Sequence, residues 1–304
     1  MQRIRISLDW TPNVNHSGFI AALHHGWYKE AGIDVDIQHP GNDNYTQSPA
    51  KKVELGLVDL ALCPMESLLS YRTKEKPFPL KAIAAVLQND LSSIAVLESS
   101  GIERPAQLDG KTYASYKAKY EDAIVASLVR NDGGKGDLVL QYPERLGIWN
   151  ILLEQQADST WIFANWEGVQ AKLGGVALRH FKMADYGIPY GYSPVLACSE
   201  AFITEHASAL RNFLAATAKG FAWAASNAGD MAKILLEWVP EADKDITMLE
   251  AAQKATGDHY LSPKTGSWGH MDEEKVEAYL KWLLEKGLET TPFSVDNIVT
   301  NELL

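Results

Sequence analysis

The chain has 304 residues, 46% of them hydrophobic and 22% charged, which is enough for two domains of ordinary size and typical of a soluble globular protein. Its formal net charge of −11 disfavours a nucleic-acid partner, because nucleic-acid binding depends on Lys and Arg contacts to phosphate. No apolar run approaches the roughly 20 residues of a membrane helix, so membrane insertion is not expected. Cys63 and Cys198 lie in apolar strand-like contexts without metal or redox spacing, and we expect buried thiols.

The N-terminal residues lack the charged-then-apolar layout of a secretory signal, because Met1 leads at once into a strand-like run. We therefore expect a cytoplasmic location. The alternative is a periplasmic protein whose signal peptide has been removed from this sequence.

The first third of the chain alternates strand-like and helix-like segments. The expected strands cover residues 4–8, 33–37, 59–62 and 80–86. The expected helices cover residues 19–31, 48–57 and 65–73. Strands separated by single helices imply a parallel sheet with right-handed crossovers.

A second alternating unit begins near residue 93. Its expected strands cover residues 93–97, 112–114, 138–140, 159–163 and 176–181. Its expected helices cover residues 120–130, 147–154 and 167–173, after a short helix and turn at 104–111.

A strand-like run at 194–198 is followed by helix-like segments alone. These helices are expected at residues 205–225, 230–238, 245–255 and 273–286. The order indicates a discontinuous first lobe of residues 1–92 and 193–304, with residues 93–192 as the second lobe. The predicted fold class is α/β, with mixed, mainly parallel sheets flanked by helices.

The first strand leads into a loop that carries Trp10, Asn13 and His16. Ligands of open α/β sheets bind at the carboxyl ends of the strands, and a flat aromatic ring beside amides suits a small planar polar ligand. The alternative is that Trp10 belongs to the core and Asn13 caps a turn.

Trp166 and Glu167 follow a strand of the second lobe. A carboxylate can accept N–H groups from the edge of a small planar polar ligand while the indole stacks on its face. The alternative is that Glu167 only complements the dipole of a helix N-terminus, and the same alternative holds for Glu66 at the start of the helix after Pro64. Ser67 can either cap that helix or bind ligand.

The first loop of the second lobe carries Tyr116, Lys117, Lys119 and Tyr120, at a place where such folds present donors to anions. For Lys119 we favour a solvated surface role. The chain is expected to return to the first lobe near residue 193. Just before this return crossing lie Tyr186, Tyr190 and Tyr192. Tyrosines offer flat contact and a hydroxyl group, and we expect one or two of them, Tyr190 included, to face the ligand.

Several motifs argue against other chemistry. His16, His24 and His25 have poor spacing for a metal site, and the glycine-rich stretch at 131–137 lacks the context of a phosphate loop and is interpreted as a turn. No hydrolase or metalloprotease motif is present in the sequence. We expect no metal ion and no cofactor.

The residues that resemble a known family are Asp9-Trp10-Thr11-Pro12-Asn13 with Asn15-His16, and the stretch GWYKEAGIDV at 26–35. They resemble the start of thiamine-pyrimidine-precursor-binding proteins and the related yeast pyrimidine synthase. The same family resemblance is seen in three further segments, at residues 57–61, 108–111 and 165–169. The resemblance spans residues 4 to about 220 and implies a type II periplasmic-binding-protein fold with a ligand cleft between two lobes. Residues 115–122, 131–136 and 186–193 resemble a narrower fungal and bacterial branch without export signals.

One departure from the family concerns chemistry. The yeast-type synthase carries a Lys that engages pyridoxal phosphate and a self-consumed His after its third strand, where this chain has Cys63 and Ser67. Synthase activity by that route is therefore not expected. The leading hypothesis is a small-molecule-binding protein for a thiamine pyrimidine precursor or a close analogue, with an ABC transporter as partner if the protein is exported. The alternative is an enzyme of thiamine pyrimidine biosynthesis, with Glu66, Glu167 and His16 as candidate acids and bases.

Overall fold

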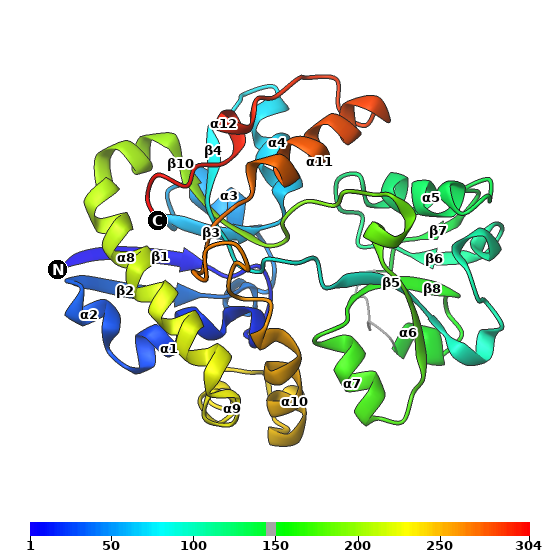
Figure 1. Cartoon of the computed structure of the whole chain (residues 1–304), viewed down its shortest axis with the longest axis horizontal. Coiled ribbons are helices and arrows are strands. Elements are labelled where there is room, and N and C mark those ends of the chain that lie inside the picture. Colours follow the sequence, from blue (N-terminus) through cyan, green and yellow to red (C-terminus); the bar gives the residue numbers. More distant parts are fainter. Residues whose placement is uncertain (144–149) are drawn as a thin grey trace. The chain divides into compact units, whose positions relative to one another are not determined.

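The computed structural model describes residues 1–143 and 150–304 and divides the chain into two compact units (Figure 1). Unit 1 comprises Met1–Asp90, Gly191–Glu277 and Phe293–Leu304, and unit 2 comprises Leu91–Tyr190 and Ala278–Pro292. The sequence analysis assigned all of residues 193–304 to the first lobe. The structure instead groups residues 278–292 with unit 2, where Glu289 binds the side chains of Lys119 and Tyr120.

Unit 1 contains a five-stranded sheet in the order β2-β1-β3-β10-β4. These strands are β1 (Gln2–Ser7), β2 (Ile33–Gln38), β3 (Leu60–Cys63), β4 (Leu80–Ala85) and β10 (Val195–Ser199). β1 pairs in parallel with β2 and β3, whereas β10 is antiparallel to β3 and β4. The carboxyl ends of β1, β2 and β3 therefore lie at one edge of the sheet, where the predicted loop residues emerge.

The helices of unit 1 come from both ends of the chain. They are α1 (Ser17–His24), α2 (Trp27–Glu30), α3 (Pro49–Glu54), α4 (Met65–Thr73), α8 (Glu200–Ser226), α9 (Ala228–Leu235), α10 (Ile246–Gly257) and α12 (Val295–Ile298). α11 (Glu273–Glu285) begins in unit 1 and ends in unit 2. Figure 1 shows α1 and α8 side by side, in blue and yellow.

Two helix predictions were wrong in detail. The single helix expected at 19–31 is α1 followed by α2, because Gly26 has a left-handed φ of 77° that ends the first helix. The helix expected at 205–225 begins earlier, at Glu200, because the Ser199 side chain caps it by accepting the Phe202 N–H at 3.1 Å. Its backbone departs from helical geometry at His206, close to the predicted start.

α10 and the turn after it support the loop after β1. The Tyr260 hydroxyl donates to the Val14 carbonyl at 2.6 Å, and the Ser17 hydroxyl donates to Gln253 Oε1 at 2.6 Å. α1 and α8 can approach closely because Gly220 has no side chain. A Cβ at this position would lie 2.0 Å from the Gly18 carbonyl oxygen. Residues far apart in sequence thus fix the start of α1 and the loop before it.

Unit 2 contains a five-stranded sheet in the order β7-β6-β8-β5-β9. Its strands are β5 (Ser92–Leu97), β6 (Thr112–Ala114), β7 (Val139–Gln141), β8 (Ser159–Phe163) and β9 (Leu178–Phe181). β6 is parallel to β7 and β8, and β5 is antiparallel to β8 and β9. Figure 1 draws this sheet with α5 (Glu121–Asn131), α6 (Asn150–Leu153) and α7 (Glu167–Leu173) around it.

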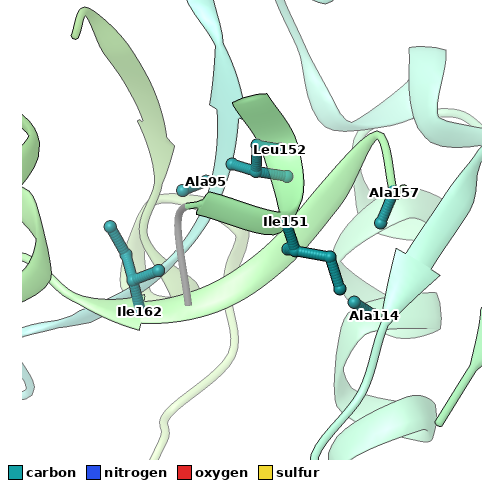
Figure 2. Close-up of a cluster of buried hydrophobic side chains, with 6 residues drawn as sticks. All are labelled: Ala95, Ala114, Ile151, Leu152, Ala157 and Ile162. Carbon is teal, nitrogen blue, oxygen red and sulfur yellow. The ribbon is translucent and has the colours of Figure 1, made fainter. Parts of the chain in front are cut away.

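A buried apolar cluster packs α6 against the sheet of unit 2 (Figure 2). It consists of Ala95, Ala114, Ile151, Leu152, Ala157 and Ile162. In Figure 2 the Ile151 side chain reaches toward Ala114 on β6. The predicted helix at 147–154 begins outside the described residues, and its described part is α6.

The predicted fold class is confirmed, because both units are α/β with a mixed sheet flanked by helices. In each sheet one strand runs against the others, β10 in unit 1 and β5 in unit 2. Each of these strands comes directly after the chain enters its unit, at residue 191 and residue 91. Within the described residues, no helix is long and apolar enough to cross a membrane.

Candidate functional site

The loop after β1 is shaped by His16, which has no exposed surface. Its Nδ1 accepts the Asn13 backbone N–H at 3.0 Å, so in the neutral ring the proton lies on Nε2, which donates to Asp9 Oδ1 at 2.8 Å. Both ring nitrogens are therefore engaged within the loop. The geometry gives His16 a role in holding Asp9 and Asn13 in place.

Asn13 and Trp10 differ in their surroundings. Asn13 is buried and caps the short helix η1 (Val14–His16), with its Oδ1 accepting the Asn15 N–H at 2.9 Å, as the alternative interpretation of the sequence holds. Trp10 is not a core residue, since 36% of it is exposed. Its ring meets Tyr45 edge-on, with 5.6 Å between the ring centroids.

The turn between β3 and α4 carries Glu66 and Ser67, which, like Asp9, act on the Cys63 thiol at the end of β3. Burial raises the pKa of the Cys63 thiol; the negative charge of Asp9 adds to this, and a hydrogen bond with Ser67 offsets it in part. Glu66 is buried in the first turn of α4, and its charge also acts on Cys63. Carboxylates and a hydroxyl thus gather at one edge of the unit 1 sheet, around a thiol that stays protonated.

In unit 2, Glu121 organises the loop between β6 and α5. Its carboxylate accepts the backbone N–H groups of Tyr116 and Ala118, both at 3.0 Å, and the Tyr113 hydroxyl at 2.7 Å. Burial raises the pKa of Glu121 even though these hydrogen bonds favour the ionised form. The loop presents Tyr116, which is 40% exposed.

The same loop contains two strained residues and a neutralised lysine. Lys117 and Tyr120 have φ values of 60° and 67°, in the left-handed region. Lys119 Nζ lies 3.2 Å from Glu289 Oε2, and the Tyr120 hydroxyl donates to the same oxygen at 2.6 Å. Burial would raise the pKa of Glu289, but these hydrogen bonds and those from Thr290 and Thr291 lower it to about 2.

Trp166 and Glu167 lie at the start of α7, and both are buried. Glu167 Oε2 accepts the Phe163 backbone N–H at 2.8 Å, so part of this carboxylate caps its own turn. The charge of Glu167 also acts on the phenol of Tyr116, whose pKa is raised by desolvation first and by Glu167 and Glu121 next. The structure therefore brings Glu167 and Tyr116 together on unit 2.

The tyrosines near the return crossing do not gather on one unit, because the chain passes from unit 2 to unit 1 after Tyr190. Tyr190 is half-buried, with its ring centroid 5.3 Å from Trp161 and 5.6 Å from Tyr279. Tyr192 is buried in unit 1, where its hydroxyl accepts the Asp272 N–H at 3.0 Å. Tyr186 accepts a hydrogen bond from Asn131 through its carbonyl group.

Other sequence candidates have structural partners. His25 stacks on Trp27 with 4.6 Å between the ring centroids, and burial lowers its pKa. The stretch at 131–137 is a turn, as predicted, and the Asp109 carboxylate accepts the N–H groups of Lys135 and Asp137. No group of three or more His, Cys, Asp or Glu residues in the described part of the chain could hold a metal ion.

Sequence reasoning missed Asp9, Tyr45 and Glu121 as members of these clusters. Glu121 could have been suspected, because an acidic residue in the first turn of a helix often binds the preceding loop. Asp9 meets His16 and Tyr45 meets Trp10 only through the folded loops, so the local sequence carries no signal for either contact.

The chain is 26% identical to the formylaminopyrimidine-binding protein of Halalkalibacterium halodurans over 285 residues, covering 93% of this chain and 85% of that protein. It is 24% identical to the 4-amino-5-hydroxymethyl-2-methylpyrimidine phosphate synthase THI11 of Saccharomyces cerevisiae over 259 residues, covering 81% of this chain and 74% of that protein. The solved structure of the periplasmic nitrate-binding protein NrtA from Synechocystis PCC 6803 matches with a TM-score of 0.73 at 15% identity, covering 100% of this chain and 87% of that one.

The structural match confirms the predicted periplasmic-binding-protein fold. The family resemblance is also confirmed, because a family model described as NMT1/THI5 like matches residues 13–229, well over half of the chain. The chain therefore belongs to the NMT1/THI5-like family.

Proposed function

We propose that this protein binds a small, planar, amino-bearing heteroaromatic molecule of the thiamine-pyrimidine-precursor class. One observation carries the proposal: each unit sets a partly exposed aromatic ring near carboxylates. In unit 1 the ring is Trp10, next in sequence to Asp9. In unit 2 it is Tyr116, on which the charges of Glu121 and Glu167 act. Aromatic faces suit a flat ring, and carboxylates suit ligand N–H groups.

The electrostatics of both clusters favour an amine over an anion. Asp9 and Glu66 lie close enough to act on the Cys63 thiol, and Lys119 is paired with Glu289. A nitrate or sulfonate would meet like charges there, whereas an aminopyrimidine would meet hydrogen-bond acceptors. The similarity to a formylaminopyrimidine-binding protein supports this ligand class.

A binding role is favoured over catalysis. The Cys63 thiol has a raised pKa and is therefore a weak nucleophile, and both ring nitrogens of His16 are engaged in the loop. The second candidate function is an enzyme of thiamine pyrimidine biosynthesis, which the similarity to the yeast synthase favours. Glu66 and Glu167 would then be candidate acids and bases.

The proposed partners are the small ligand and an ABC-type importer that receives it. Similarity to a binding protein and to the fold of a periplasmic protein favours the periplasmic alternative over the cytoplasmic location expected from the N-terminal residues. A fusion of an alkaline phosphatase reporter to the full-length native reading frame tests this location. Reporter activity is expected, and its absence would favour the cytoplasm.

Calorimetry and native mass spectrometry test the proposed function. We expect the purified protein to bind 4-amino-5-hydroxymethyl-2-methylpyrimidine, to ignore nitrate and an alkanesulfonate, and to release the pyrimidine at its original mass. Binding of the anions without the pyrimidine would overturn the proposed ligand class. A changed mass after incubation would favour the enzyme.

A further inference from the structure

The loop between β2 and α3 has an unusual backbone that the sequence did not reveal. Asn44 and Tyr45 have φ values of 52° and 59°, so two consecutive residues other than glycine adopt left-handed conformations. Asn enters this region fairly readily, but Tyr does so against steric repulsion of its Cβ. Such conformations persist where the surrounding contacts impose them, and they concentrate at functional sites.

The contacts that impose this conformation lie on both sides of Tyr45. The Tyr45 N–H donates to the Pro40 carbonyl at 2.9 Å, and the Thr46 N–H donates to the Asp43 carbonyl at 3.2 Å. The buried Lys52 ammonium pairs with Asp43 Oδ2 at 2.9 Å and anchors the loop to α3. Backbone hydrogen bonds and an ion pair therefore hold the loop that carries Tyr45.

This loop brings Tyr45 to Trp10. β1 and β2 are parallel neighbours with Ser7 opposite Gln38, so their loops leave the sheet at the same edge. The two rings meet edge-on, with 5.6 Å between centroids and 63° between planes. Tyr45 is 49% exposed and Trp10 is 36% exposed, so the contact leaves much of both rings open to solvent.

We propose that Tyr45 is a second aromatic contact for the planar ligand and determines specificity for aromatic rings. The inference rests on the proposed function and adds a residue to it. A ligand ring stacked on the Trp10 indole would meet Tyr45 at an angle close to the edge-to-face geometry that aromatic pairs prefer. A non-planar amine of equal charge would interact favourably with the carboxylates but could not pack against the Trp10 and Tyr45 rings in this way.

Simple surface packing of Tyr45 on Trp10 makes a different prediction. In that case removing the Tyr45 ring would lower stability and leave ligand affinity unchanged. If the strained loop instead exists to present the ring, the two properties separate. A glycine at this position accommodates the positive φ without strain but has no ring to offer the ligand.

The experiment measures affinity for 4-amino-5-hydroxymethyl-2-methylpyrimidine and the thermal midpoint for three variants. Tyr45→Ala is expected to weaken binding roughly 5- to 150-fold, the range seen for loss of base–aromatic stacking. Tyr45→Phe keeps the ring and is expected to keep most of the affinity. Tyr45→Gly is expected to bind as weakly as Tyr45→Ala, with a thermal midpoint at or above that of Tyr45→Ala.

The control variant is Leu57→Ala, an exposed apolar side chain of unit 1, which should bind like the wild type. If the wild type does not bind the pyrimidine, the proposed function fails. If the wild type binds and Tyr45→Ala binds equally well, the role of Tyr45 is wrong while the proposed function stands. Equal losses in Tyr45→Phe and Tyr45→Ala would also overturn the role of the ring.

Discussion

At the scale of single residues, Glu167 combines an observed structural contact with a proposed role in ligand binding. One of its oxygens accepts the Phe163 N–H, which is the structural role that its place in the first turn of α7 allows. Its charge also acts on Tyr116, a partly exposed ring of unit 2. A substitution that tests ligand recognition must therefore leave the hydrogen bond to Phe163 intact.

Glu167→Gln meets this requirement, because the amide oxygen can still accept the Phe163 N–H while an N–H₂ group replaces the other oxygen. We expect a larger loss of affinity for 4-amino-5-hydroxymethyl-2-methylpyrimidine than for the same ring without its amino group, since only the former has its N–H groups facing a donor. Titration calorimetry of both ligands with both proteins measures the difference. Equal losses would show that Glu167 does not read the amino group.

Trp10 and Trp166 were both candidate ligand contacts in the sequence analysis, but their burial differs. Trp10 is 36% exposed and Trp166 is 4% exposed. Trp10→Ala should therefore lower affinity by ~1–3 kcal/mol with little effect on stability. Trp166→Ala should also destabilise the protein by ~3–5 kcal/mol, because it leaves a cavity. Urea unfolding and calorimetry separate the two effects, and wild-type affinity in stable Trp10→Ala would remove Trp10 from the site.

At the scale of elements, the Glu121 carboxylate holds two backbone N–H groups of the loop before α5. Glu121→Gln retains one acceptor but turns a donor toward the N–H of Tyr116 or Ala118. We expect a loss of ~1–3 kcal/mol in stability, faster hydrogen exchange at these two amides, and weaker ligand binding without any change to the Tyr116 side chain.

The matched control for this loop is Glu98→Gln, an exposed acidic residue elsewhere in unit 2. It removes the same charge from the same unit, so it should leave amide exchange and affinity near wild-type values. If Glu121→Gln binds ligand like the control, Tyr116 does not need this loop conformation for its role.

Local patterns predicted the elements well where side-chain periodicity and turn residues agree. The expected bounds of α4, α7, β6 and β8 coincide with those in the structure. The predicted helix bounds were wrong where a single backbone feature overrode periodicity. These features are Gly26 between α1 and α2 and the Ser199 cap of α8. Periodicity cannot show either feature, because a left-handed glycine and a capping serine act on the backbone alone.

The location of the candidate site residues could be predicted from the sequence, but the side chains that contact them could not. The order of strands and loops was enough to place Trp10 and Tyr116 at the carboxyl ends of strands. The partners that hold the site residues, Asp9 for His16 and Glu289 for Lys119, come from tertiary contacts. A sequence of one protein contains no direct signal of such pairs, which is why Lys119 was expected to be solvated at the surface rather than paired with Glu289.

At the scale of the whole molecule, α11 and the residues after it belong to both units. α11 begins in unit 1, but residues 278–292 group with unit 2 and the chain then returns at Phe293. The lobe boundaries expected from the sequence, with chain crossings only near residues 92 and 193, therefore omit this further exchange between the units. Glu289 is the polar anchor of this segment, because it binds both Lys119 and Tyr120.

Glu289→Gln tests this anchor through the pH dependence of stability. The folded-state pKa of Glu289 is about 2, below the ordinary value of 4.5, so the ionised group stabilises the fold fully above pH 4.5 and loses this effect as the pH falls toward 2. The shift corresponds to about 3 kcal/mol, which solvent screening reduces to roughly 1–2 kcal/mol. Urea unfolding should therefore show wild type more stable than Glu289→Gln by this amount at pH 7, with the gap narrowing between pH 4.5 and 2.

The control Glu285→Gln removes an exposed carboxylate of α11 that pairs with Lys281 at 3.8 Å, and it should change stability by less than ~0.5 kcal/mol at every pH. Hydrogen exchange in Glu289→Gln should rise over residues 278–292 and the loop before α5 together, because each loses the other as its support. A uniform rise over unit 1 as well, or a stability gap that does not vary with pH, would mean that Glu289 is not the anchor of the segment.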